Sequence, residues 1–316
     1  MIEIGKDIDY AVNKLKDGGI VGIPTETVYG LGCNALNESS VKKIFKLKSR
    51  PKNDPIICHT NSVEKIRKYV DHFPKNAEIL ARKFWPGPLT ILLRKNKLIP
   101  DIITSKSEYV GFRIPNNKIT LSVLGKLDFP LAAPSANKFE YISPTNPQHI
   151  IQNFNDGIDY ILDDGNCLIG IESTILGFEK EKTVIFRLGG ITLEDIEKSI
   201  GKCYINKDKV KIPGSFKKHY SPNKKVYIGD IKKLSKKFEK KKIGILSFNK
   251  KYKFVDEKYQ IVMSEKSSLY EASQNFYSSL YILDNLEIDL IIASYLPNNN
   301  IGRSINDRLK KCSENG

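Results

Sequence analysis

The sequence predicts an α/β protein that has a mixed sheet in its first part and a second, smaller α/β unit at its end. Segments with helical spacing of apolar residues alternate with short apolar segments over the first two hundred residues. Some strand-like segments follow one another with no helix between them, which favours a sheet with both parallel and antiparallel neighbours. At 316 residues, the chain is long enough to build two domains.

The first domain is expected over residues 1–206. An amphipathic segment at 7–18 is interpreted as a helix that ends at Gly18, and a strand at 20–23 follows it. Further helices are expected at 38–48, 62–70, 75–84, 118–126 and 192–200. Further strands are expected at 55–60, 89–94, 109–115 and 131–135, with a hairpin from 173–178 and 183–187.

The periodic pattern breaks at 207–222, where Pro, Gly and Lys occur without a period, and this stretch is interpreted as a linker. The second domain is expected over 223–316. Its predicted strands are 225–229, 241–248, 259–263 and 286–294, and its predicted helices are 266–286 and 301–312. This domain has no G-x-G-x-x-G, so nothing in it supports a dinucleotide site.

The composition favours a soluble protein of the cytoplasm. Apolar residues make up 40% of the chain, and no apolar run reaches the roughly 18 residues that a membrane helix needs. The N-terminal residues lack the basic and apolar regions of a secretory signal. Five scattered cysteines include no C-x-x-C pair, which argues against a disulfide framework and a structural zinc site.

The net charge of +15 raises the question of nucleic-acid binding. Only eight of the 51 basic residues are arginine, and the charge is spread along the chain without a basic tail. A solvated lysine surface explains this pattern, so the few arginines are the more informative cations.

Polar residues stand at the ends of predicted strands, where open α/β sheets place their sites. The loop after strand 20–23 contains Thr25, Glu26 and Thr27, followed by Gly30 and Gly32. The threonines either cap a turn or form a ligand-binding lip, and the glycines let the backbone come close to another group.

A second group combines Lys48 and Arg50 at the end of a predicted helix, ahead of Pro51. Cations at a helix C-terminus are favoured by the helix dipole, but an arginine fork also suits phosphate. His59 ends the next strand, where it could bind a carboxylate or serve a structural role.

A third and a fourth group complete the set. Arg113 lies among apolar neighbours, so it must meet either a partner carboxylate or an anionic ligand. Ser135 and Asn137 follow a strand and offer polar donors. In the predicted hairpin, Ser173 opens one strand and Arg187 closes the other. Together these groups suit a nucleotide and a small anionic partner.

These stretches occur in an order that resembles a known family, the YrdC-like threonylcarbamoyl-adenylate synthases in their long, two-domain form. The resemblance covers nearly the whole chain and is carried by PTETVYGLG, KSRP, FWPGPLT, GFRIP, APSAN, ESTI, HYSP and IGRSINDRL. It implies a twisted mixed-sheet YrdC-like domain with an open concave site, joined to a smaller Rossmann-like domain.

The resemblance also implies the reaction. L-threonine and bicarbonate give a carbamate, which attacks the α-phosphate of ATP to form threonylcarbamoyl-AMP and pyrophosphate, with Mg2+ accompanying the ATP and no organic cofactor. A separate transferase then moves the threonylcarbamoyl group to an adenosine beside the tRNA anticodon. The protein's own tRNA binding is expected to be weak or indirect, and no membrane partner is expected.

Residue roles follow from the same resemblance. The threonine side is expected to use Thr27, His59, Arg113 and Ser173. The ATP side is expected to use Lys48, Arg50, Asp54, Tyr109, Ala133, Ser135, Asn137, Ser143, Arg187 and Tyr220, with Lys48 and Arg50 assigned to catalysis and Tyr220 closing over the nucleotide from the linker. Asp54 stands where the family usually has Asn, Tyr109 where Thr or Ser is common, and RLGG where RPG is usual.

Two other functions compete with this one. An RNA-binding module explains the charge but leaves Arg113 and the S-x-N stretch unexplained. A carbamoyl-adenylate-forming enzyme of the hydrogenase-maturation type contains a related domain in a much larger protein, and this chain lacks the zinc-finger cysteines expected there.

Overall fold

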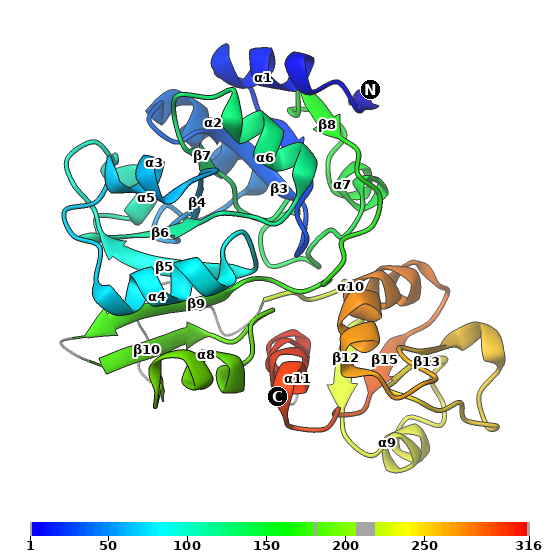
Figure 1. Cartoon of the computed structure of the whole chain (residues 1–316). Helices are drawn as coiled ribbons and strands as arrows, with labels where there is room; N and C mark the ends of the chain where they lie inside the picture. Colours follow the sequence, from blue (N-terminus) through cyan, green and yellow to red (C-terminus); the bar gives the residue numbers. More distant parts are fainter. Residues whose placement is uncertain (1, 180–181, 207–218, 315–316) are drawn as a thin grey trace. The chain divides into compact units, whose positions relative to one another are not determined.

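The computed structural model describes residues 2–179, 182–206 and 219–314, and Figure 1 shows the whole chain. Most of the expected linker, residues 207–218, lies outside the described residues. The described chain forms two compact units that are not continuous in sequence. The first comprises residues 2–139, 144–167 and 172–206, and the second comprises 140–143, 168–171 and 219–314.

The first unit is built on a mixed sheet, as the sequence predicts. Its eleven strands within the described residues run in the order β1-β8-β2-β3-β7-β4-β6-β5-β9-β10-β11. Strand β5 pairs antiparallel with β6 and parallel with β9, so the sheet contains both kinds of neighbour. The strands are β1 (Ile4–Gly5), β2 (Val21–Ile23), β3 (Gly30–Asn34), β4 (Cys58–His59), β5 (Leu89–Arg94), β6 (Tyr109–Arg113), β7 (Leu131–Ala132), β8 (Tyr160–Leu162), β9 (Thr174–Glu179), β10 (Lys182–Arg187) and β11 (Tyr204–Ile205).

Helices cover this sheet and begin at side-chain caps. Asp7, Asn37, Ser62, Asn117, Asn146 and Thr192 each accept a hydrogen bond from a first-turn amide, which satisfies a donor that the helix leaves unpaired. The helices are α1 (Ile8–Lys16), α2 (Glu38–Lys48), α3 (Val63–Arg67), α4 (Lys75–Phe84), α5 (Asp101–Thr104), α6 (Lys118–Gly125), α7 (Pro147–Asn153) and α8 (Leu193–Ile200). Helices α4 and α8 lie side by side along the β9–β10 end of the sheet (Figure 1).

The core of the first unit lies between the sheet and its helices. The largest cluster of buried side chains joins strand residues such as Ile91 and Phe112 to helix residues such as Ile44 and Leu80. A second cluster packs α1 and α6 against β2 and β8. These apolar contacts stabilise the sheet and thereby fix the ends of its strands, where the polar residues lie.

Gly30 in β3 lets the loop after β7 pack closely against this strand. A Cβ on Gly30 would lie 3.2 Å from the Cβ of Ala133 and 3.3 Å from the carbonyl oxygen of Pro134. The Leu31 amide donates to that Pro134 carbonyl at 2.8 Å, and the Ala136 amide donates to the Tyr29 carbonyl at 2.8 Å. Gly30 therefore serves close packing of two protein segments.

The second unit is a smaller α/β fold with a parallel sheet. Its strand order is β12-β15-β13-β14, and each neighbouring pair is parallel. The strands are β12 (Lys225–Ile228), β13 (Ile243–Ser247), β14 (Gln260–Val262) and β15 (Leu290–Ala293). The helices are α9 (Ile231–Lys237), the 3-10 helix η1 (Glu257–Tyr259), α10 (Leu269–Asn285) and α11 (Asn300–Cys312). This arrangement agrees with the expected second α/β domain.

Two short segments from earlier in the chain belong to the second unit, and α10 holds both. The Tyr141 hydroxyl donates to Asp284 Oδ2 at 2.6 Å, and the Tyr281 hydroxyl donates to the Ile142 carbonyl at 2.8 Å. The side-chain Nε2 of Gln274 donates to the Leu168 carbonyl at 2.5 Å. Helix α10 thus fixes the segments 140–143 and 168–171.

No helix among the described residues has the length and apolar character needed to cross a membrane.

Candidate active site

Arg113 ends β6 and forms a buried ion pair. Its Nη2 lies 2.7 Å from Glu26 Oε2, its Nη1 donates to Thr27 Oγ1 at 2.9 Å, and its Nε donates to the Gly87 carbonyl at 3.2 Å. An unpaired guanidinium at this depth would be very costly, and Glu26 supplies a partner carboxylate, one of the two alternatives that the sequence left open. The guanidinium is held rigidly from three sides.

The loop 25–28 forms a directed chain of hydrogen bonds with Arg113. Thr25 Oγ1 donates to the Val28 carbonyl at 2.6 Å and lies 2.8 Å from Thr27 Oγ1. A hydroxyl has one proton, so Thr27 must be the donor to Thr25 while it accepts from Arg113. Thr25 also accepts from the amides of Thr27 and Val28, each at 3.2 Å, which is the turn-capping role. Thr27 is therefore fixed in orientation.

His59 lies beside Arg113 in the sheet and is held neutral. Strands β4 and β6 are parallel and place His59 opposite Arg113 in register. Burial lowers the pKa of His59 to about 3, and the positive charge of Arg113 contributes to the shift. A neutral imidazole can donate and accept hydrogen bonds but carries no charge for an anion at neutral pH.

A second polar group forms where β5, β9 and β10 meet. Arg187 Nη2 donates to Ser173 Oγ at 3.0 Å, and Arg187 Nε donates to the Ser173 carbonyl at 3.0 Å. Thr90 Oγ1 lies 2.8 Å from the same Ser173 Oγ. The pairing of β9 with β10 shifts register between Ile185 and Arg187, an irregularity that re-aims a side chain. Ser173 thus joins Thr90 and Arg187.

Lys48 anchors the loop after β7 from inside the protein. Its Nζ donates to the Ser135 carbonyl at 2.5 Å and to the Asn137 carbonyl, and its own carbonyl accepts from the Phe139 amide at 2.9 Å. Burial, with a further contribution from Arg50, lowers the pKa of Lys48. The structure therefore gives Lys48 a positioning role for residues 135–139.

Arg50 forms the second buried ion pair. The C-cap Ser49 has φ 53°, which ends α2 and turns the chain toward Arg50. Arg50 Nη2 lies 2.8 Å from Asp54 Oδ2 and donates to the Pro55 carbonyl at 2.7 Å, and Arg50 Nε donates to the Asp54 carbonyl at 3.2 Å. Arg50 is therefore fixed before any ligand binds.

Asp54 connects the two polar groups electrostatically. Burial raises the pKa of its carboxyl, while the charges of Arg50, Lys48 and Arg187 act in the opposite direction. Since Arg187 also holds Ser173, one arginine belongs to both groups. Within the first unit, Arg187 therefore both holds Ser173 and acts on the Asp54 that pairs with Arg50.

The loop after β7 contributes backbone groups and two expected side chains. The Ala133 amide donates to the Ile57 carbonyl at 3.1 Å, and Ser135 forms an isolated bridge with Gly30. Asn137 Nδ2 donates to the Lys138 carbonyl at 2.7 Å. The loop is fixed between β3 and Lys48, so its groups are preorganised.

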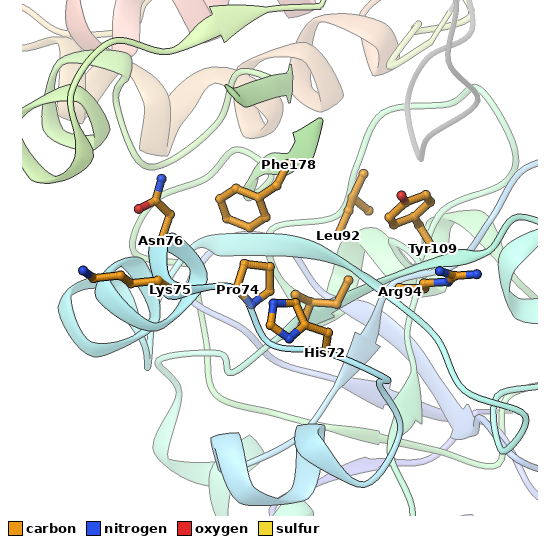
Figure 2. A pocket seen from close by; sticks show the side chains of 9 residues that line it. His72, Pro74, Lys75, Asn76, Leu92, Arg94, Tyr109 and Phe178 are labelled. Atoms are coloured by element: carbon orange, nitrogen blue, oxygen red, sulfur yellow. The ribbon is translucent and has the colours of Figure 1, made fainter. Parts of the chain in front are cut away.

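Tyr109 lies at the opposite end of β6 from Arg113. Its side chain is 47% exposed and lines a pocket of about 600 Å³ with Arg94, Leu92, His72 and Phe178. Figure 2 shows this pocket, with Tyr109 near Arg94 and Phe178 on the far side of Leu92. The structure does not bring Tyr109 into the group around Arg113, and its contact with ATP stays a prediction.

Ser143 and Tyr220 belong to the second unit. Tyr220 has φ 62° and its ring centroid lies 4.0 Å from that of His219 and 5.9 Å from that of Tyr277. The Arg308 guanidinium lies 5.5 Å from the Tyr220 ring centroid, within range of a cation–π contact. The expected roles of Ser143 and Tyr220 toward ATP stay predictions.

The residues do not form a cage for a metal ion. Across residues 2–179, 182–206 and 219–314, no three or more His, Cys, Asp or Glu side chains gather so that they could hold one. The carboxylate of Asp54, the only acidic residue proposed for the ATP side, is already paired with Arg50. Asp54 therefore does not fit a metal ligand, and no step is assigned to a protein-held metal.

Two residues of this site carry no role in the sequence prediction. Glu26 lies in the loop after β2, and its pairing with Arg113 depends on a contact between residues far apart in sequence. Thr90 has the one hydroxyl group in the largely apolar strand β5. A polar residue within an apolar run was the only feature of the sequence that could have pointed to it. Both side chains are buried.

Comparison with known proteins covers both parts of the chain. Residues 13–189 match a family model described as "Telomere recombination", and residues 191–313 match one described as "Threonylcarbamoyl-AMP synthase, C-terminal domain". A threonylcarbamoyl-AMP synthase of Pyrococcus abyssi is 36% identical over 97% of this chain and 94% of its own length. One of Bacillus subtilis is 32% identical over 97% of this chain and 92% of its own length.

Comparison with solved structures also relates this chain to the same group of proteins through its fold. The crystal structure of P. abyssi Sua5 complexed with L-threonine superposes with a TM-score of 0.92 at 34% identity, covering 100% of this chain and 98% of that one. Escherichia coli YciO covers 60% of this chain with a TM-score of 0.51 at 21% identity, which shows a shared fold alone. From the two matched family models and the full-length relatives, the chain belongs to the threonylcarbamoyl-AMP synthase family in its two-domain form.

Proposed function

We propose that this protein makes threonylcarbamoyl-AMP from L-threonine, bicarbonate and ATP. In the first step the threonine nitrogen forms a bond to the bicarbonate carbon, and water and a proton leave. In the second step an oxygen of the resulting carbamate bonds to the α-phosphorus of ATP, and pyrophosphate leaves. The names of the full-length relatives support this reaction, and so does the L-threonine in the complex of P. abyssi Sua5.

The observation that carries the proposal is that Arg187 contacts Ser173 and also acts electrostatically on Asp54. This arginine donates to Ser173, an expected threonine residue, and its charge acts on Asp54, beside the expected phosphate residue Arg50. In a site that joins two anionic substrates, the reacting groups of the two substrates must come within bonding distance of each other. The link of Arg187 to both groups supports a site in which the two substrates meet beside it.

On the threonine side, we assign the α-carboxylate to Arg113. Thr27 is oriented by its hydrogen bonds to Arg113 and Thr25, so its position is fixed before threonine arrives. His59 is neutral and can hydrogen-bond threonine without adding charge. Ser173 completes the set, and its hydroxyl is held by Thr90 and Arg187.

On the ATP side, we assign the phosphates to Arg50 and Arg187, with Lys48 holding the loop that carries Ser135 and Asn137. No step of the reaction requires a protein nucleophile, since the carbamate is itself anionic. Rate acceleration then comes from positioning and from charge stabilisation. Magnesium enters with the ATP, because it usually binds through phosphates and a few protein groups.

The wider role of the product is part of the same proposal. Threonylcarbamoyl-AMP is a mixed anhydride that a second enzyme must consume, and we propose a tRNA threonylcarbamoyl transferase in the cytoplasm as that consumer. The protein's own affinity for tRNA is expected to be weak. Water must be kept from both the carbamate and the product, which favours a closed site during turnover.

The test is release of pyrophosphate from ATP by the full chain. The proposal expects release that depends on both L-threonine and bicarbonate, with the α-phosphorus recovered in threonylcarbamoyl-AMP. Release that is independent of threonine would contradict it. Tight and sequence-selective RNA binding without pyrophosphate release would instead support the RNA-binding module.

A further inference from the structure

The carboxylate of Asp54 is paired with Arg50 and lies within electrostatic range of two further basic residues of the expected phosphate site. Its Oδ2 is 2.8 Å from Arg50 Nη2, and its side chain is fully buried. Lys48 at the end of α2 and Arg187 on β10 also act on it electrostatically. Neither carboxylate oxygen of Asp54 makes a hydrogen bond of good geometry. Asp54 is therefore held in this buried place by the positive charge of its neighbours.

A bound polyphosphate would change that balance. Phosphate oxygens that contact Arg50 compete with Asp54 for the same guanidinium, and their negative charge offsets that of Lys48 and Arg187. A buried carboxylate whose cations are neutralised is disfavoured in its charged form by desolvation and by repulsion from the phosphates. Protonation of the Asp54 carboxylate relieves both the desolvation penalty and the repulsion from the phosphates, and it requires the binding of one proton.

We propose that Asp54 is a counter-ion that ATP displaces, so that ATP binding at Arg50 is accompanied by uptake of one proton at Asp54. The inference rests on the proposed function, because it assumes that Arg50 contacts the phosphates. It adds a positioning role: Asp54 holds Arg50 ready before ATP binds and becomes a neutral neighbour afterwards. It also makes ATP affinity depend on pH.

The direction of that dependence follows from linkage. When the ATP complex binds more protons than the free protein, the affinity for ATP falls as pH rises. The fall is up to tenfold for each pH unit between the pKa of Asp54 in the free protein and its higher pKa in the complex. An amide at position 54 has nearly the same shape but no proton to bind. In Asp54→Asn, this contribution to the pH dependence of ATP affinity should therefore be absent.

The experiment is isothermal titration of the full chain with a non-hydrolysable ATP analogue and Mg2+. Titrations at one pH in two buffers of different ionisation enthalpy give the number of protons exchanged. We expect the wild type to take up as much as one proton more than Asp54→Asn. We also expect the affinity ratio of the two proteins to change by up to tenfold for each pH unit. Asp9→Asn is the matched control, since Asp9 is an exposed carboxylate paired with Lys126.

A second measurement needs no variant. The infrared difference spectrum between ATP-bound and free wild type should show a new carboxylic-acid band and a loss of carboxylate absorption. Equal proton counts for wild type and Asp54→Asn, or no acid band in the wild type, would overturn the inference while leaving ATP binding established. If the wild type binds no ATP analogue and releases no pyrophosphate, the proposed function itself fails.

Discussion

Arg113 Nη2 and Glu26 Oε2 lie 2.7 Å apart, and the two side chains are only 5% and 4% exposed. The same arrangement recurs between Arg50 and Asp54. Each of these two arginines, which we assign to substrate anions, is thus already neutralised by a carboxylate of the protein. Both cations are held in place before substrate binds, and both ion pairs affect stability as well as function.

Replacing Glu26 should destabilise the fold. Glu26→Gln leaves the Arg113 charge buried without a carboxylate, and breaking a buried pair in this way costs about 3–5 kcal/mol. Urea unfolding of the variant and the wild type at pH 7 measures the loss. Glu78→Gln is the control, because its pair with Arg67 is half exposed and should contribute less than about 1 kcal/mol. Similar losses in both variants would show that Glu26 is not the essential partner of Arg113.

Replacing Arg50 should slow the reaction, and it should also lower stability because it leaves the buried Asp54 carboxylate without its partner. Arg50→Ala removes one donor to the developing charge, and we expect turnover to fall roughly 10²–10³-fold. Pyrophosphate release measures it, with circular dichroism as the check on folding. Arg82→Ala, on an exposed face of α4, should leave turnover unchanged. Wild-type turnover in Arg50→Ala would remove Arg50 from the phosphate site.

Lys48 should respond differently, because it bonds to the carbonyls of Ser135 and Asn137. Lys48→Met keeps the length of the side chain but leaves two carbonyls without their donor, a loss of about 1–3 kcal/mol for each buried group. We expect lower stability together with a higher KM for ATP. A variant that loses turnover with unchanged stability would indicate direct contact between Lys48 and phosphate.

His59 should make the fold sensitive to mild acid. Its pKa is lowered to about 3 in the folded protein, whereas an unfolded histidine titrates near 6.5. Below pH 6.5 the unfolded chain therefore binds the proton and the folded chain does not, so the free energy of unfolding falls as pH falls. This one group contributes a loss of about 2 kcal/mol between pH 7 and pH 5.

Urea unfolding at the two pH values tests this dependence. His59→Gln should lose less stability than the wild type between pH 7 and pH 5. His72→Gln, a change at an exposed histidine, should follow the wild type. If all three proteins lose the same amount, His59 is not held neutral by burial.

Helix α10 should control the mobility of the segment 140–143. Tyr141→Phe removes the hydrogen bond to the Asp284 carboxylate, and bonds to charged groups contribute about 1.5–3 kcal/mol. Hydrogen exchange of peptides that span 140–143 should be faster in the variant. Tyr10→Phe, which alters a partly exposed ring outside the second unit, serves as the control. Unchanged exchange in Tyr141→Phe would mean that other contacts fix the segment.

Much of the fold could be predicted because its long elements have strong patterns. The apolar run 89–94 forms β5, and the hairpin from 173–178 and 183–187 forms β9 and β10. The sequence prediction missed β8 at Tyr160–Leu162 and α7 at Pro147–Asn153. Three strand residues followed by two aspartates give almost no periodic signal, and β8 is stabilised by pairing with β1 and β2.

The site could be predicted only in part, for a similar reason. The cost of burying Arg113 required a partner, but the choice of Glu26 depends on tertiary contacts that no local pattern contains. Likewise, Asp54 lies four residues from Arg50, yet its interaction with Arg187 requires the whole sheet. That Arg113 needs an anionic partner could be predicted from its apolar neighbours, but which residue provides the charge could not.

The segments 140–143 and 168–171 lie within the sequence range of the first unit but belong to the second unit. This limits where the chain can be divided into separate domains. A chain that ends at Asn206 keeps both segments but lacks α10, so Ile142 and Ile171, fully buried in the intact protein, lose the unit to which they belong. Gly170 fits so closely that an added Cβ would lie 2.4 Å from the Ser273 carbonyl oxygen. A chimera that exchanges the C-terminal part with a relative's should therefore exchange two internal tetrapeptides as well, because a simple cut at the linker leaves the second unit incomplete.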